Sequence, residues 1–236
     1  MPNNPYSHLF LPLTVGKVQL RNRIALPAVL TNYARDSKVT PRWHDFLVER
    51  ARGGTGLLVS EIIAVDPLAL SHSAIVAGFD ERNDSALAET AKAVHAAGGR
   101  IVAQLWHPGR QQLWHPSHSP MGVSDQPDAY SWTVPHVMDE GDLERLGEAY
   151  ISVAERLARV GFDGIELHGA HGYLLTQLMS PWSNTRTDRY GGTLLNRTRL
   201  VADIAGAIRK RCSEDFIVGL KMPADEGVVG GIDPDE

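Results

Sequence analysis

Short apolar runs alternate along most of this chain with longer stretches of helical spacing, and this alternation restricts the possible folds most strongly. Strands separated by helices in this way are the pattern of repeated βα units, which build a parallel sheet. Nearly continuous hydrophobicity within a run indicates a strand that is covered on both faces. The runs predict five strands, at Arg23–Val29, Gly56–Ile63, Arg100–Trp106, Phe162–Leu167 and Phe216–Met222.

The stretches between these runs predict helices, and a small hairpin precedes the first strand. Thr40 is a plausible N-cap before Pro41, and Gly53, Gly98 and Gly161 are placed as helix stops. Residues 13–20 (LTVGKVQL) predict a hairpin with its turn at Gly16. The predicted helices are Pro41–Arg52, Asp84–Ala97, Asp142–Val160 and Leu195–Cys212.

One connection, residues 107–139, is much longer than the others. It is rich in proline and has neither a sustained helical nor a sustained strand period. A long irregular segment inside a compact domain is usually a functional loop. We therefore predict that it covers the mouth of an active site.

Composition restricts the class of protein and its partners. The chain has 23 Lys and Arg residues against 28 Asp and Glu, a formal charge of −5, and its basic residues are spread out, so we expect no nucleic-acid partner. Cys212 is the only cysteine, which fits a reducing cytoplasm. No apolar run reaches membrane-spanning length and no signal peptide is recognisable. Small molecules are the expected partners.

Polar residues gather where the fourth predicted strand ends. The segment HGAHGY brings His168, His171 and Tyr173 close together at the strand end where parallel α/β folds bind ligands. A structural histidine pair is one interpretation. Zinc binding is another, with a third ligand from His107, His115 or His118. Two neutral imidazoles and a phenol also suit hydrogen bonding to a substrate oxygen and delivery of a proton.

Several motifs occur in an order that resembles the Old Yellow Enzyme family of FMN-dependent oxidoreductases, including its dienoyl-CoA reductase and amine dehydrogenase branches. The most specific is HGAHGYLLTQLMSPWSNTRTDRYGGTLLNRTR, from His168 to Arg199. The resemblance covers nearly the whole chain and implies an α/β fold, a (β/α)8 TIM barrel, over residues 1–236. The other motifs are Asn22-Arg23-Ile24, Arg50 through Glu61, Ala103-Gln104-Leu105 and His107-Pro108-Gly109-Arg110.

The resemblance also implies roles for individual residues. His168 and His171 match the pair that binds the substrate oxygen, and Tyr173 matches the proton donor of alkene-reducing members. Gln104 matches the amide that pairs with the flavin pyrimidine edge. Lys221 stands where an arginine usually accompanies the flavin, so positive charge is kept without the guanidinium fork. The residues expected to contact the flavin ring are Pro27, Ala28, Val29, Leu30 and Ile62.

The position of Leu30 departs from the family pattern. A threonine or cysteine often stands there and tunes the flavin potential through a hydrogen bond. Leu30 cannot make one, and the neighbouring Thr31 is the candidate to replace it.

The implied activity is hydride transfer from NAD(P)H through FMN to an activated alkene. Dehydrogenation of an N-methylated amine and dienoyl-CoA reduction are alternatives within the family, and a catalytically silent, truncated barrel is an alternative of another class. A closed barrel typically takes about 250 residues. We therefore expect this chain to be an incomplete barrel with about strands 1–5, which a second polypeptide or a second copy would complete.

Overall fold

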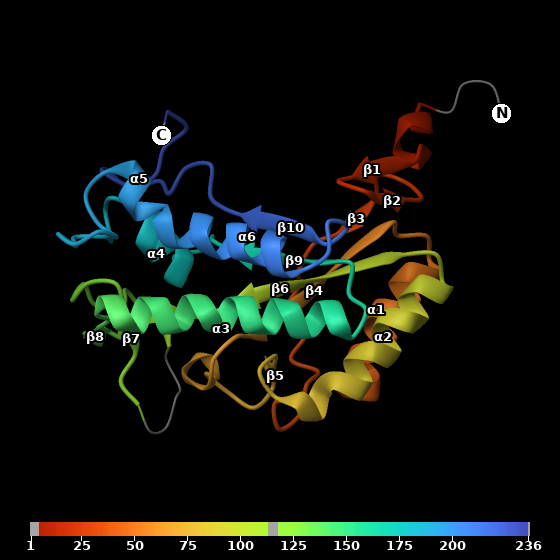
Figure 1. Ribbon diagram of the computed structural model, residues 1–236, viewed down its shortest axis with the longest axis horizontal. Coiled ribbons are helices and arrows are strands. Elements are labelled where there is room, and N and C mark those ends of the chain that lie inside the picture. Colours follow the sequence, from red (N-terminus) through yellow and green to blue (C-terminus); the bar gives the residue numbers. More distant parts are fainter. Residues whose placement is uncertain (1–4, 113–117, 236) are drawn as a thin grey trace.

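The computed structural model describes residues 5–112 and 118–235, whose centre is a curled parallel sheet (Figure 1). Its strands follow the chain order across the sheet, from β3 at one edge to β10 at the other, and every pairing is parallel. A doubly wound sheet would reverse this order at its centre, so the topology is that of a barrel wall. The strands are β3 (Ala25–Leu26), β4 (Leu57–Ala64), β6 (Arg100–Trp106), β9 (Gly164–His168) and β10 (Ile217–Lys221).

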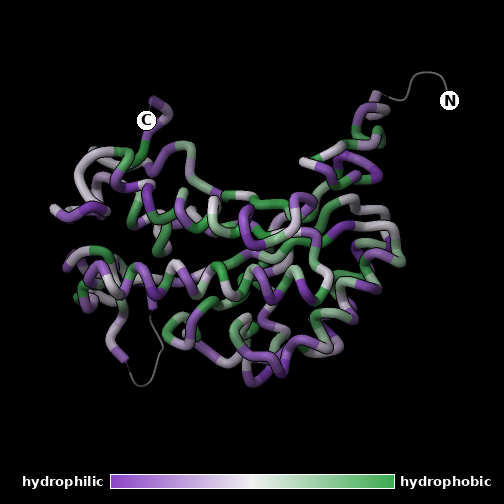
Figure 2. Tube along the Cα trace, viewed as in Figure 1, coloured by the Kyte–Doolittle hydropathy of each residue, from purple (hydrophilic) through white to green (hydrophobic). Residues whose placement is uncertain are grey.

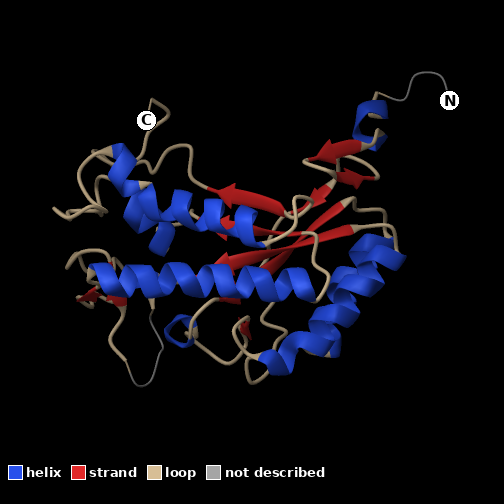
Figure 3. Ribbon diagram, viewed as in Figure 1, coloured by secondary structure: helices blue, strands red, loops and turns tan. Residues whose placement is uncertain are grey.

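Helices connect successive strands and pack against the sheet (Figure 3). In α1 the hydroxyl of Thr40 accepts a hydrogen bond from the Trp43 backbone N–H (3.2 Å), as predicted for an N-cap. Helix α3 begins with a capping box between Asp139 and Asp142. The helices are α1 (Pro41–Arg52), α2 (Asp84–Ala96), α3 (Glu140–Arg159), α4 (Leu174–Met179), α5 (Leu194–Arg197) and α6 (Arg199–Arg211), with short 3-10 turns at Ser7–Phe10, Pro67–Ala69, Glu81–Asn83 and Gly109–Gln111.

Strand β6 shows how the sheet divides the interior. Ile101, Ala103 and Leu105 belong to the main core between sheet and helices. Trp106, from the alternate set, belongs to a second, smaller cluster with Ile62. Successive strand residues point to opposite faces, so this second face is the inner face of the barrel wall. Figure 2 shows the apolar strands within the more polar helical layer.

The predicted N-terminal hairpin is confirmed. Strands β1 (Leu13–Val15) and β2 (Val18–Leu20) pair antiparallel, and Gly16 at the turn has a φ of +59°. Such a conformation carries little cost for glycine. The hairpin lies beside the amino-terminal ends of the central strands, at the end of the sheet opposite to their carboxyl ends (Figure 1).

Two predicted elements differ from the structure. The first strand is only Ala25–Leu26, because Pro27 lacks a backbone N–H and the chain beyond it turns toward Glu61. The last predicted helix is two helices, α5 and α6, with Thr198 between them, whose hydroxyl donates to the Leu194 carbonyl oxygen (2.8 Å). A short strand, β5 (Val76–Ala77), pairs with β4 and was not predicted.

The long loop, residues 107–139, is less irregular than its sequence indicates. It carries a small parallel pair, β7 (Met121–Gly122) and β8 (His136–Val137), because its proline-rich arms meet at these residues. Residues 113–117, including His115, lie outside the described residues. Within the described ranges no helix is long and apolar enough to cross a bilayer.

Candidate active site

The loop after β9 places three predicted site residues around one turn. The backbone N–H of Gly169 donates to the Lys221 carbonyl oxygen on β10 (2.7 Å), which anchors the turn to the neighbouring strand. His171 and Gly172 both have left-handed backbone conformations, with φ of +62° and +72°. This is uncommon for histidine and folds the chain back sharply. Tyr173 then stands at the N-cap position of α4.

The side chains of His168, His171 and Tyr173 meet at this turn. The ring centroid of His168 lies 5.0 Å from that of His171 and 5.0 Å from that of Tyr173, and each pair of rings is edge to face. Tyr173 also packs edge to face on Trp106, at 5.3 Å. His168 is only 4% exposed, whereas His171 is exposed and Tyr173 half-buried. The cluster is therefore buried at His168 and accessible to solvent at His171.

The environment keeps these groups neutral near pH 7. Burial lowers the pKa of His168 to about 3, and the charges of His171 and Lys221 act in the same direction. Burial and Lys221 also lower the pKa of His171. The pKa of the Tyr173 phenol is raised by burial and by the nearby Tyr130, so it stays protonated.

Hydrogen bonding selects one tautomer of His168. The Ala170 backbone N–H donates to its Nδ1 (3.4 Å), so the single proton of the neutral ring lies on Nε2. His168 can therefore donate a hydrogen bond from Nε2 to a bound oxygen. A group of three or more potential metal ligands is not found within residues 5–112 and 118–235.

Gln177 holds the turn, and sequence reasoning missed it. It is 1% exposed, and its amide nitrogen donates to the carbonyl oxygens of Gly172 (2.7 Å) and Pro108 (3.3 Å). Its Oε1 accepts from the Arg110 backbone N–H (3.3 Å). It thus joins the histidine turn to the start of the long loop. The signal was a glutamine within the otherwise apolar LLTQLM segment of α4, where burial requires hydrogen-bond partners.

The inner face carries the predicted flavin contacts of three strands. Gln104 on β6 is opposite Ile62 on β4 and Glu166 on β9. Lys221 on β10 is opposite His168, on the same face. The structure therefore brings Gln104, Ile62 and Lys221 to one side of the wall, together with Glu166, which was not predicted.

In the segment after β3, the side chain of Thr31 has a different partner from the one predicted. Val29 and Leu30 are 49% and 47% exposed, and Pro27 and Ala28 precede them without strand pairing. Thr31, considered as a substitute for a polar flavin contact, instead donates to Glu61 from its hydroxyl (2.8 Å) and from its backbone N–H (2.6 Å). Both Thr31 donors are thus committed to Glu61, which lies at a bulge in β4.

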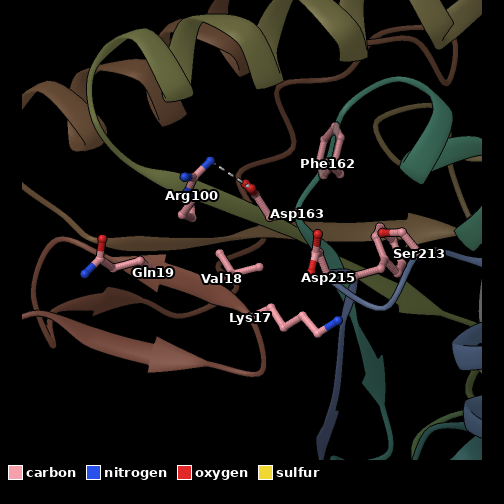
Figure 4. A pocket seen from close by; sticks show the side chains of 9 residues that line it. Lys17, Val18, Gln19, Arg100, Phe162, Asp163, Ser213 and Asp215 are labelled. Carbon is pink, nitrogen blue, oxygen red and sulfur yellow. Dashed lines mark hydrogen bonds and ion pairs between the residues drawn. The ribbon is translucent and has the colours of Figure 1, made fainter.

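A hollow of about 390 Å³ lies far from this site, beneath the hairpin (Figure 4). Its walls come from the beginnings of the strands. Asp163 there accepts hydrogen bonds from the Ile101 backbone N–H (2.8 Å), His95 Nε2 (2.7 Å) and Arg100 (3.3 Å). These polar groups pair among themselves, so we interpret this end as structural, in keeping with barrels whose sites lie at the opposite end.

Comparison with known proteins gives consistent matches. The sequence profile described as "NADH:flavin oxidoreductase / NADH oxidase family" matches residues 8–236. The chain is 36% identical over 230 residues to an NADH oxidase of Thermoanaerobacter brockii, covering 96% of this chain and 35% of that protein. A 2-naphthoyl-CoA reductase complex superposes with a TM-score of 0.92 at 26% identity, covering 98% of this chain and 37% of that one. Morphinone reductase in complex with tetrahydroNAD gives 0.86 at 27% identity, covering 95% and 66%.

The chain thus spans about a third of the first two proteins and two thirds of the third. The matches confirm the predicted barrel fold and the resemblance to the Old Yellow Enzyme family, whose matched relatives are named as flavin oxidoreductases dependent on NADH or NADPH. The chain belongs to the NADH:flavin oxidoreductase / NADH oxidase family.

Proposed function

We propose that this chain forms the substrate side of an FMN-dependent oxidoreductase that uses NAD(P)H to reduce an activated alkene. One observation carries the proposal: the neutral ring of His168, with its proton on Nε2, lies 5.0 Å from the ring of Tyr173, whose phenol stays protonated. A hydrogen-bond donor beside a proton donor suits a substrate whose oxygen gains charge while a neighbouring carbon gains a proton.

The described residues fit FMN as the cofactor. The Gln104 amide offers both a donor and an acceptor, which suits the pyrimidine edge of a flavin. Lys221, on the same face, supplies positive charge, and Val29 and Leu30 leave apolar surface uncovered beside the next strand. When bound, FMN would supply the redox chemistry between NAD(P)H and substrate.

The residues of the turn would act on the substrate. His168 and His171 would donate hydrogen bonds to the carbonyl oxygen of an enone and stabilise the enolate-like charge that develops there. Tyr173 would give its phenolic proton to the α-carbon. Trp106, packed on Tyr173, would exclude water from one side of that proton. These roles suit an alkene activated by a carbonyl group. The single cysteine of the chain fits a cytoplasmic protein.

The first test is the visible spectrum of the purified protein with and without FMN, followed by anaerobic addition of NADH or NADPH. We expect bound-flavin absorbance that bleaches with reductant and recovers when cyclohexenone is added. A protein that binds no FMN would contradict the proposal and favour a catalytically silent barrel. Bleaching of the oxidised flavin by an N-methylated amine as electron donor, and no recovery of the reduced flavin with enone, would favour the amine dehydrogenase alternative.

A further inference from the structure

Glu166 makes a specific contact with the predicted flavin-binding amide. It lies on β9 directly opposite Gln104 on β6, with both side chains on the inner face. Nε2 of Gln104 donates to Oε1 of Glu166 over 2.7 Å, and Gln104 is 2% exposed. Among the described residues, this is the one hydrogen bond that the Gln104 side chain makes. The Glu166 carboxylate forms no ion pair with any of those residues. Within residues 5–112 and 118–235, the Glu166 side chain is therefore hydrogen-bonded to Gln104 alone.

The chemistry of the pair removes an ambiguity. An amide side chain can turn by 180° and exchange its oxygen and nitrogen at little steric cost. An ionised carboxylate only accepts hydrogen bonds, so the atom that faces Glu166 must be the nitrogen. The positions of the Gln104 Oε1 acceptor and of the second N–H donor are then fixed, and both remain free to bind a ligand. A neutral partner, such as another amide, would accept either orientation.

That order matters for a flavin. The pyrimidine edge presents two carbonyl oxygens on either side of the N3–H, so a matching amide must offer its acceptor to N3–H and its donor to one oxygen. An amide turned the wrong way would place donor against donor and acceptor against acceptor. Preorganised hydrogen-bonding groups bind more tightly because no free energy is lost in reorienting them.

We propose that Glu166 is a positioning residue that fixes the orientation of the Gln104 amide for the flavin pyrimidine edge. Gly219 on β10 is opposite Glu166 and has no side chain, so no group from β10 competes for the carboxylate. Lys221, a cation on this face, is opposite His168 instead. The inference rests on the proposed FMN binding and adds a residue that does not itself touch the cofactor.

A double-mutant cycle tests it. FMN dissociation constants are measured by flavin fluorescence for the unchanged protein, Glu166→Gln, Gln104→Ala and the double variant. We expect Glu166→Gln to weaken FMN binding by about tenfold, the order of one hydrogen bond. In the Gln104→Ala background the same change should have no further effect, because Glu166 acts through that amide. The matched control is Glu89→Gln on the exposed side of α2.

A second measurement does not depend on FMN. The side-chain amide of Gln104, followed by nitrogen-15 NMR in the protein without FMN, should change its chemical shift in Glu166→Gln and not in Glu89→Gln. Equal effects of Glu166→Gln in both backgrounds, or tight FMN binding by Glu166→Gln, would overturn this inference alone. Absence of FMN binding by the unchanged protein would overturn it together with the proposed function. Urea unfolding of each variant checks that it is folded.

Discussion

The ring of Tyr173 stands edge to face against that of His168, with their centroids 5.0 Å apart, although one residue begins a helix and the other ends a strand. The left-handed pair His171 and Gly172 makes this possible by reversing the chain between them. The phenol is thereby held beside a neutral imidazole that has its proton on Nε2. The backbone geometry of this turn thus holds the proposed hydrogen-bond donor and the proposed proton donor side by side.

Replacement of Tyr173 by Phe removes the phenolic proton and keeps the ring. We expect enone reduction to fall by roughly 10²-fold, because general acid catalysis contributes about that much. Reduction of the flavin by NAD(P)H should change little, since no proton is delivered to a substrate carbon in that half-reaction. Stopped-flow measurement of the two half-reactions separates the effects. Equal losses in both would show that Tyr173 serves the fold and not the proton transfer.

Stability should fall in acid because two histidines are buried in neutral form. Burial lowers the pKa of His107 and of His168 from 6.5 to about 3. Between these values the unfolded chain binds protons that the folded chain does not. The stability present above pH 6.5 is therefore lost as the pH falls toward 3, by up to about 1.4 kcal/mol per pH unit for each histidine.

Urea unfolding at several pH values between 7 and 4 checks this. His168→Asn should lose stability less steeply with falling pH than the unchanged protein. His136→Asn, at an exposed position on β8, is the matched control and should keep the original slope. A slope that stays the same in His168→Asn would contradict the assignment of His168 as a buried neutral group.

The elements that the sequence predicted well are those in which local pattern and packing agree. Strand β6 and helix α1 have the predicted bounds, since β6 is a nearly continuous apolar run interrupted only by Gln104 after Arg100, and α1 has a proline after a capping threonine. The histidine turn was found because its residues are adjacent in sequence. Such features need no knowledge of distant neighbours.

The parts that were missed depend on partners far along the chain. Glu166 and Gln177 read as an ordinary strand glutamate and helix glutamine, and only the register of β9 with β6 and the approach of the long loop give them their contacts. Thr31 was expected near the flavin, but the bulge in β4 turns Glu61 toward it. Periodicity predicts which face a residue occupies, and it does not predict a partner across strands.

Gln177→Met should destabilise the protein, because it leaves the Gly172 carbonyl oxygen and the Arg110 backbone N–H without their partner. The Pro108 carbonyl oxygen loses one of two hydrogen bonds and keeps the one from the Gln111 backbone N–H. Methionine keeps the volume, so the loss measures hydrogen bonding. We expect the free energy of unfolding to fall by roughly 2–4 kcal/mol, as a buried polar group left unpaired costs about 1–3 kcal/mol. Chemical denaturation measures it, with Gln19→Met on the exposed side of β2 as the control. A loss equal to the control would show that the Gly172 carbonyl oxygen and the Arg110 backbone N–H find other partners.

Thr31→Val removes the hydroxyl that donates to the buried Glu61 carboxylate and leaves the shape of the side chain almost unchanged. Burial already raises the pKa of Glu61, and the backbone and hydroxyl bonds from Thr31 oppose that rise, so loss of the hydroxyl bond should raise the pKa further. We expect a loss of about 1–3 kcal/mol at pH 7, where the carboxylate is short of a donor. The loss should shrink as the pH falls, because a protonated Glu61 needs that donor less. Thr187→Val, at an exposed position, is the control.

The same Thr31→Val variant also tests whether Thr31 reaches the cofactor. Since the hydroxyl points to Glu61 and not toward the predicted flavin site, the flavin spectrum and potential should stay the same. A shifted potential would mean that Thr31 does reach the cofactor.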